Sequence, residues 1–379
     1  MESLVLCNQS ALIKGRSILD NFKYVQRSAV MLRKRKIPKL LLKLDISKAF
    51  DTVSWTFVLE VLAAWGFGQR WRGWISQLLS TASTRVLLNG SPGQPIEHRR
   101  GLRQGDPLSP MLFVLAMDLL NRLCVKAGDD GLLQPSGVSA IKHHCSLYAD
   151  DVILFATPTR SEARVIDRIL ELFGDASGLR TNVTKCSITP IFGCEDDLDE
   201  FRSMMACPIL QFPITYLGAP LSTRCLPKSQ FRPLVEKVAA RLPKWQGPLM
   251  NKSGRLTLVK STLSTMPIYL TMSDKLPPWV IKQLDSIRRN FLWTGQDKAV
   301  RGKNVVAWPT VCRPTAYGGL GVIDLKLTGI ALRTRWLWLQ KTDASRSWSA
   351  LQIQVEPEVR ALFQASVTTR TMRGVAAQR

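Results

Sequence analysis

The chain of 379 residues is longer than one ordinary domain and carries a formal net charge of +23, so two or three domains and an anionic partner are expected. Three histidines, and eight cysteines without a CxxC pair, disfavour a zinc module. No signal peptide and no long uncharged apolar run are recognised, which predicts an intracellular protein with reduced thiols and no membrane span.

The charge is uneven along the chain. Residues 1–200 carry 25 basic and 21 acidic side chains, whereas residues 201–379 carry 27 and 8. A basic half of this kind favours a nucleic acid as the anionic partner. Solubility or a ribosome-like basic fold is the alternative reading of the same charge.

The first hundred residues predict a helix, a strand, two helices and a second strand. In chain order these lie at residues 17–34, 40–46, 47–67, 69–82 and 84–96. The first strand is an apolar run closed by Asp45, and the second strand runs into a turn rich in glycine and proline.

The chain from about residue 101 to 221 predicts a second set of helices and hairpins. They are a long helix from near Pro107, a hairpin at 143–157, a helix at 160–177, a strand entered through 177–188 and a tight hairpin at 214–221. The acidic stretch at 194–200 is expected to be a solvated loop.

Beyond a domain boundary near residue 222, the pattern changes to basic helices with many tryptophans. The predicted helices lie at 229–245, 253–266, 276–293 and 323–341, and no periodicity is recognised past about residue 350. The tryptophans could stack on bases, but helical spacing favours a core role for most of Trp245, Trp293, Trp308, Trp336 and Trp338.

Three carboxylates are the strongest candidates for chemistry. Asp45 ends a strand, and Asp150 with Asp151 forms the turn of the hairpin that contains the letters YADD. Clustered carboxylates supply the hard oxygen ligands that a pair of Mg²⁺ ions needs, and the ions offset the cost of gathering negative charge at a strand turn. Taken alone, YADD is more often a turn with surface aspartates.

Five motifs in order resemble the palm motifs of reverse transcriptases of non-LTR retrotransposons, most closely the plant LINE type. They read LKLDISKAFDTVSW, GLRQGDPLSPMLF, YADDVILFA, SGLRTNVTKC and YLGAPL, and the resemblance covers roughly residues 8–345. The segment that begins WPTVCRPTAYGGLGVIDL is similar to the region that follows the thumb in plant elements. A match of five motifs is far more specific than YADD alone.

The resemblance implies an α+β right-hand polymerase. Its expected parts are partial fingers at 1–40, a palm of antiparallel sheet and helices at 41–221, an α-helical thumb at 222–300 and a C-terminal extension at 301–379. The implied activity is RNA-directed DNA synthesis with two Mg²⁺ ions, an RNA template, a DNA primer and dNTPs. A nicked chromosomal primer would imply action in the nucleus.

The resemblance also implies roles for single residues. The metal-binding and catalytic positions are Asp45, Asp150 and Asp151. The positions near the incoming dNTP are Phe50, Gln104, Gly105 and Lys185, and those near the primer are Tyr148, Tyr216, Leu217 and Gly218. Phe50 would exclude a 2′-hydroxyl, with helix core as the alternative. The alternatives are a helix-start loop for Gln104 and Gly105, a solvated side chain for Lys185 and simple packing of a hairpin tyrosine for Tyr148.

Basic residues outside the palm are candidates for contact with the nucleic-acid backbone. Gly15 and Arg16 match a fingers motif near the template path. In the second half, basic side chains on helical segments could track a duplex, as in a polymerase thumb, namely Arg241, Lys244, Lys252, Arg255 and Lys260.

The chain also departs from the family pattern. Met1 falls inside the fingers region, and neither an endonuclease nor a Cys/His-rich segment is recognised, so a truncated or decayed copy is expected. The rival hypothesis is therefore a non-catalytic nucleic-acid-binding remnant. A group II intron-type maturase is a weaker option, because YLGAPLSTR and the thumb resemble the LINE type.

Overall fold

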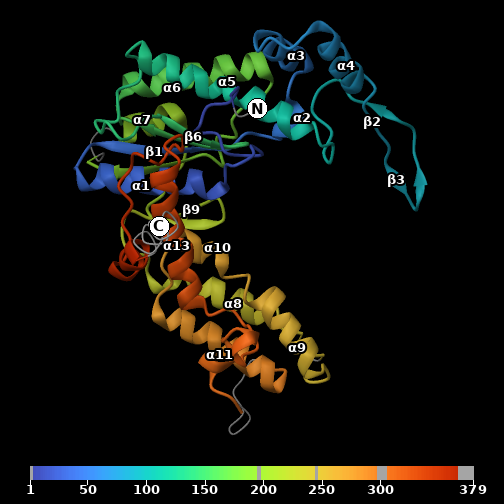
Figure 1. Ribbon diagram of the computed structural model, residues 1–379. Coiled ribbons are helices and arrows are strands. Elements are labelled where there is room, and N and C mark those ends of the chain that lie inside the picture. The colour runs from blue at the N-terminus through green and yellow to red at the C-terminus, as the bar shows by residue number, and fades with distance from the viewer. Residues whose placement is uncertain (1–2, 194–197, 244–245, 297–304, 366–379) are drawn as a thin grey trace, which may run out of the picture. The chain divides into compact units, whose positions relative to one another are not determined.

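The computed structural model describes residues 3–193, 198–243, 246–296 and 305–365 (Figure 1). The chain forms two compact units of mixed helix and strand. Unit 1 comprises Met1–Arg224 together with Ser345–Leu351, and unit 2 comprises Cys225–Ala344 with Gln352–Arg379. Among the described helices, none has the length and apolar character needed to cross a membrane.

Unit 1 is built on a four-stranded antiparallel sheet in the order β6-β7-β1-β8. The strands are β1 (Lys39–Leu44), β6 (Cys145–Tyr148), β7 (Asp151–Ala156) and β8 (Ser187–Phe192). The register pairs Leu42 with Leu154 and Leu44 with Val152. The predicted strand at 40–46 and the predicted hairpin at 143–157 are confirmed.

Both faces of this sheet are covered, which explains why the β1 sequence is an almost continuous apolar run. On one face, Leu42 and Leu44 join the main core with the helices that follow in the chain. On the other face lies α1 (Ile18–Lys34), where the Tyr24 ring meets Phe155 edge-on at 6.4 Å. Figure 1 shows α1 on one side of the sheet and α5 and α6 on the other.

The remaining helices of unit 1 are α2 (Ala49–Thr52), α3 (Trp55–Ala64), α4 (Gln69–Ser80), α5 (Ser109–Asp129), α6 (Arg160–Ser177) and α7 (Leu198–Met205). The expected single helix at 47–67 is interrupted at Val53, because the chain there turns extended before Ser54 caps α3. The acidic stretch was expected as a loop, yet its described end is helical, since Phe201 and Met205 bury one face of α7.

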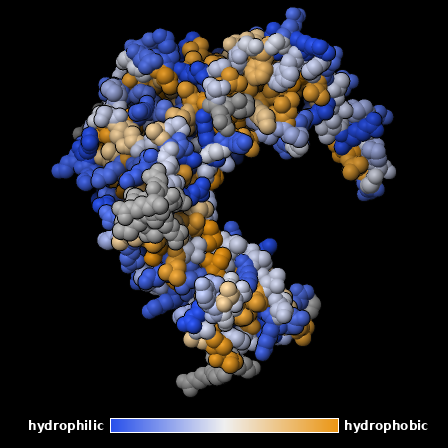
Figure 2. All heavy atoms as spheres, viewed as in Figure 1, coloured by the Kyte–Doolittle hydropathy of each residue, from blue (hydrophilic) through white to orange (hydrophobic). Residues whose placement is uncertain are grey.

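Short hairpins complete unit 1. Their strands are β2 (Ser83–Thr84), β3 (Leu87–Leu88), β4 (Ser91–Pro92), β5 (Ile96–Glu97), β9 (Ile214–Tyr216) and β10 (Ala219–Leu221). The ribbon of β2 to β5 exposes Leu87, Leu88 and Ile96, and Figure 2 shows this apolar surface. The β9–β10 hairpin confirms the predicted tight turn: Leu217 and Gly218 both have positive φ, as a type I′ turn requires.

Unit 2 is helical. Its elements are η1 (Lys228–Gln230), α8 (Arg232–Ala240), α9 (Lys252–Leu258), η2 (Val259–Leu263), α10 (Ile268–Ser273), α11 (Pro278–Thr294), α12 (Trp308–Val311), η3 (Thr315–Tyr317) and α13 (Leu325–Thr342). Its core includes Leu284, Phe291 and Trp308. Trp308 and Trp336 are buried, as the predicted core role requires, whereas Trp293 is half-buried and Trp338 is exposed; Trp245 lies outside the described residues.

Candidate active site

The three predicted aspartates meet at one end of the central sheet. In the antiparallel ladder, Leu44 of β1 pairs with Val152 of β7, so Asp45 lies opposite Asp151 one position further on. Asp150 occupies the two-residue turn between β6 and β7, after Ala149 with a φ of 54°. The pairing of β1 with β7 therefore brings Asp45 to the same strand ends as Asp150 and Asp151, more than a hundred residues away in sequence.

The charges of these aspartates act on one another. Partial burial raises the pKa of Asp151, and the neighbouring carboxylates of Asp150 and Asp45 raise it further, while Lys43 opposes them. Asp45 is 38% exposed and lies 4.0 Å from the Lys185 ammonium. The three carboxylates are thus close enough for Asp150 and Asp45 to disfavour the charged form of Asp151.

Asp151→Asn is expected to stabilise the fold at pH 7 in EDTA. Because folding raises the pKa of Asp151, its ionised form is less favourable in the folded than in the unfolded chain. The variant removes this penalty, so thermal melting should rise by about 2 °C. The difference should close as the pH falls through the raised pKa, where the wild-type carboxyl is neutral. Asp130→Asn on the exposed end of α5 is the control, and an equal rise there would contradict the argument.

The hairpin turn is held by a residue that sequence reasoning missed. Gln9 forms a parallel bridge with Leu147 of β6, and its side-chain oxygen accepts hydrogen bonds from the amides of Ala149 and Ala11. A polar run at 8–10 that is fully buried was the available signal, but burial is not visible in one sequence. Gln9 positions the turn that carries Asp150.

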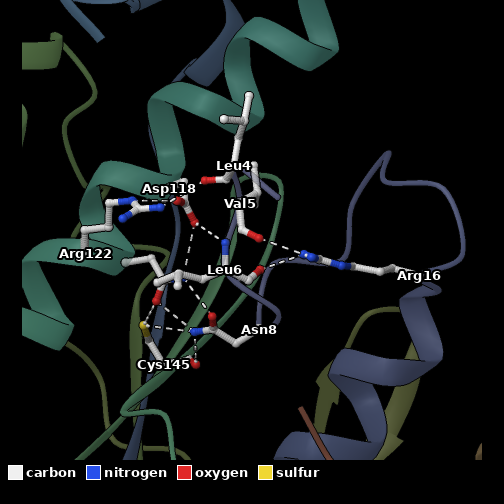
Figure 3. A network of polar contacts seen from close by, with 9 residues as sticks. Leu4, Val5, Leu6, Asn8, Arg16, Asp118, Arg122 and Cys145 are labelled. Carbon is white, nitrogen blue, oxygen red and sulfur yellow. Dashed lines mark hydrogen bonds and ion pairs between the residues drawn. The ribbon is translucent and has the colours of Figure 1, made fainter. Parts of the chain in front are cut away.

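The segment that contains Gln9 is anchored by a buried polar network (Figure 3). Asp118 of α5 is fully buried and accepts hydrogen bonds from the Leu6 amide and from Arg122. Asn8 exchanges side-chain hydrogen bonds of 2.8 Å with Asn121. Burial raises the pKa of Asp118 despite these donors. The network locks the N-terminal segment to β6 and so to the aspartate turn.

Arg16 makes several contacts within unit 1. Its guanidinium donates to the carbonyls of Leu6 and Gln9 at 2.6 Å and to that of Val5 at 3.1 Å. Figure 3 shows this side chain directed at the Val5 and Leu6 carbonyls. These three bonds hold the N-terminal segment in place, and a contact between Arg16 and a template stays a prediction.

Phe50 lies in α2, and Gln104 lies in the loop that precedes α5. The Phe50 ring is half-buried and stacks on Phe113 with centroids 4.6 Å apart, while its carbonyl accepts from the Leu102 amide. Gln104 is exposed and donates to Asp51 at 3.5 Å. Gly105 has a φ of 90° and open space where a Cβ would stand, so glycine is required there by the backbone alone.

The other palm candidates divide into exposed and buried groups. Lys185 is exposed beside Asp45, and Tyr148 is half-buried at the end of β6. The Tyr216 side chain is fully buried, with its ring 6.4 Å from that of Phe22, so Tyr216 could offer a primer only its backbone.

The basic residues predicted in unit 2 also divide. Arg241 and Lys252 are exposed and Lys260 is half-buried, whereas Lys244 lies outside the described residues. Arg255 is buried and donates to the carbonyls of Gly247, Pro248 and Trp293. Its guanidinium closes a helix junction and is not free to bind a phosphate.

The donor chemistry of the aspartate site fits a hard cation. Carboxylate oxygens are the ligands that Mg²⁺ prefers, and one carboxylate is exposed while another is partly so. In the part of the chain that the structure describes, no three acidic, histidine or cysteine side chains are gathered closely enough to form a ready metal site.

Carboxylates at the ends of adjacent antiparallel strands, with a lysine 4.0 Å from one of them, are of the kind that phosphoryl-transfer enzymes use. A model of the family "Reverse transcriptase (RNA-dependent DNA polymerase)" matches residues 3–221. The match covers more than half of the chain, so the chain belongs to the reverse transcriptase family.

Two relatives align with much of the chain. It is 28% identical over 362 residues to the "Transposon TX1 uncharacterized 149 kDa protein" of Xenopus laevis, covering 93% of the chain and 26% of that protein. It is 29% identical over 318 residues to the Pol polyprotein of "type-2 retrotransposable element R2DM" of Drosophila melanogaster, with 78% and 27% covered. The chain therefore spans about a quarter of these relatives.

A solved telomerase structure from Candida albicans, in complex with a fragment of telomeric RNA, matches with a TM-score of 0.40 and 11% identity. It covers 92% of this chain and 54% of the telomerase chain. A likeness at this level carries no argument about the site.

Proposed function

We propose that the chain is the RNA-directed DNA polymerase domain of a non-LTR retrotransposon of the plant LINE type. It extends the 3′-hydroxyl of a DNA primer with dNTPs on an RNA template, and it acts in the nucleus. The observation that carries this proposal is the position of Asp45 opposite Asp151, with Asp150 in the adjacent turn, inside the region that matches the family.

In this proposal, two Mg²⁺ ions would be held by Asp45, Asp150 and Asp151. The ions would activate the 3′-hydroxyl of the primer and neutralise negative charge on the phosphates of the dNTP. Lys185, 4.0 Å from Asp45, binds the triphosphate or protonates the leaving pyrophosphate. Phe50 lies under the sugar of the incoming dNTP. The β9–β10 hairpin supports the primer end through its backbone.

Primer extension tests the proposal directly. Wild-type chain and the Asp150→Asn/Asp151→Asn double variant are incubated with a DNA primer on an RNA template, dNTPs and Mg²⁺. Extension by the wild type that is lost in the double variant is the expected result. If neither extends the primer while both bind it tightly, the chain is a non-catalytic nucleic-acid binder, the rival function that its basic second half also suits.

Phe50→Ala is expected to relax the choice between dNTP and rNTP by roughly 10–100-fold, because a small side chain leaves room for the 2′-hydroxyl. Single-nucleotide incorporation with each substrate measures the ratio. Phe57→Leu is the matched control, since it trims a buried ring that meets Phe173 in the core. The role of Phe50 is wrong if both variants keep the wild-type ratio.

Binding of a primer–template duplex is expected to weaken steeply with salt, because lysine and arginine contacts to phosphates release counterions. The exposed or half-exposed residues Arg241, Lys252 and Lys260 are the candidates in unit 2. Each change to Ala that removes a phosphate contact should reduce, by about one, the slope of the logarithm of the binding constant against the logarithm of the salt concentration. Lys126→Ala, an exposed residue of α5, is the control. An unchanged slope removes these residues from the interface.

A further inference from the structure

Unit 2 contains a cavity that the proposed polymerase activity does not use. It has a volume of about 380 Å³ and lies between the start of α11, the first half of α13 and residues 356–359. We call it the α11–α13 cavity. Its apolar wall consists of aliphatic side chains from all of these segments, namely Leu276, Ile281, Leu325, Ile330 and Val359. A hollow of this size accommodates one or two large apolar side chains.

The rim of the α11–α13 cavity is positively charged. Lys275, Lys282 and Lys326 are exposed at its edge. Two carboxylates also line the cavity and offset part of that charge. Glu356 lies 4.0 Å from Lys275 and 3.2 Å from Arg333, and Glu358 is exposed, so four basic side chains face two acidic ones. Within the described ranges, neither Lys282 nor Lys326 forms an ion pair. Two ammonium groups therefore remain available beside an apolar hollow.

The combination of an apolar cavity and a positively charged rim suits some anionic partners better than others. None of the lining residues is aromatic, so the cavity has no surface on which a nucleobase would stack. A phosphate chain needs only the lysines and gains nothing from an aliphatic wall. A polypeptide with a large apolar side chain flanked by carboxylates uses both features, as in the burial of an anchor residue within a charged rim.

The chain itself does not supply such a segment. Its last residues, 366–379, contain three arginines and no acidic residue. In its acidic stretch, Leu198 packs against the core of unit 1 and Glu200 pairs with Arg160 at 3.1 Å. A net charge of +23 also opposes close approach of a second copy.

We propose that the α11–α13 cavity is a docking site for an acidic peptide segment of a partner protein. The segment inserts a leucine, isoleucine or phenylalanine between Ile281 and Ile330. Its aspartates or glutamates contact Lys282 and Lys326 on the rim.

The test is a selection of randomised peptides of about 12 residues on the purified full chain, followed by fluorescence anisotropy of the selected peptides. The first variant, Ile330→Trp, fills the cavity. The second, Lys282→Glu/Lys326→Glu, reverses the rim and changes only exposed residues, so it should fold normally. The control, Lys228→Glu/Lys237→Glu, makes the same change of charge at exposed positions that do not line the cavity.

The expected result is enrichment of peptides with one large apolar residue flanked by acids. Their affinity should fall by about tenfold or more in both cavity variants and stay unchanged in the control. The proposal is overturned if no such peptides are enriched, or if the two charge-reversal variants weaken binding equally. It is also overturned if a short single-stranded RNA displaces the peptides and if Ile330→Trp lowers the affinity of the chain for that RNA. The occupant of the cavity is then a nucleic acid.

Discussion

Asp45→Asn is expected to reduce primer extension by about a thousandfold or more. Its carboxylate stands opposite Asp151 at the strand ends and is the partner most remote in sequence from the YADD turn. Charge stabilisation by a bound cation is worth several kcal/mol, and about 4 kcal/mol corresponds to a thousandfold at 1.36 kcal/mol per factor of ten. Single-turnover incorporation of one dNTP on an RNA template gives the rate.

The duplex affinity of the same variant is expected to stay within about twofold of wild type, because phosphate contacts to lysines and arginines dominate that affinity. Asp130→Asn is the control for loss of one carboxylate at an exposed position. A variant that retains activity within about tenfold of wild type would remove Asp45 from the metal site. Equal loss in the control would point to general destabilisation instead.

The arrangement of the aspartates could be predicted because each lies where a strongly patterned strand ends. The run LLLKL predicts a buried strand, and CSLY with DVILFA predicts a hairpin, so the carboxylates fall at turns by pattern alone. What the pattern cannot give is which strands become neighbours. The register of Leu44 with Val152 supplies that, and it places Asp45 opposite Asp151.

The arginines show the limit of the same reasoning. Arg16 and Arg255 were predicted to contact a nucleic-acid backbone, yet each donates to three backbone carbonyls. A sequence gives the charge of an arginine but not its surroundings. A guanidinium with several donors serves equally well to satisfy carbonyls at a chain crossing. Only the surroundings of the guanidinium in the structure distinguish contact with a phosphate from hydrogen bonding to backbone carbonyls.

The segment that follows α13 was also beyond prediction, since no element was predicted between residue 341 and about residue 350 and little periodicity is visible beyond. In the structure, the short segment Ser345–Leu351 belongs to unit 1, where Trp348 and Leu351 are fully buried. A segment of seven residues is too short to show a helical or strand period, so its place in unit 1 depends on tertiary contacts alone. Unit 1 is therefore larger than the region 3–221 that matches the family.

Asp20 is the centre of this long-range contact. Its carboxylate is buried and accepts hydrogen bonds from Arg346 at 2.8 and 2.9 Å, from the Trp348 indole at 2.7 Å and from the Ser17 amide at 2.8 Å. The Ser17 bond also closes the capping box that begins α1. One carboxylate thus joins the first helix of unit 1 to the returning segment.

Asp20→Ala is expected to destabilise unit 1 by about 3–5 kcal/mol, because it removes the buried carboxylate that pairs with Arg346 and accepts from the Trp348 N–H, while Arg346 keeps its bond to the Gly15 carbonyl. The melting temperature should fall by roughly 10 °C. Asp175→Ala, which breaks an exposed pair with Arg180, should change stability by about 1 kcal/mol or less. Thermal melting of each variant, followed by circular dichroism, measures the difference.

A double-mutant cycle separates this contact from the effect on the helix cap. Arg346→Ala removes the ion pair but leaves Asp20 to cap α1. If the two side chains act as one unit, the double variant should be less destabilised than the sum of the single variants by about 1–3 kcal/mol. Additive effects would mean that Asp20 stabilises α1 alone and that the returning segment contributes independently. Coupling of the stated size would make residues beyond 344 a structural part of the unit that carries the aspartates.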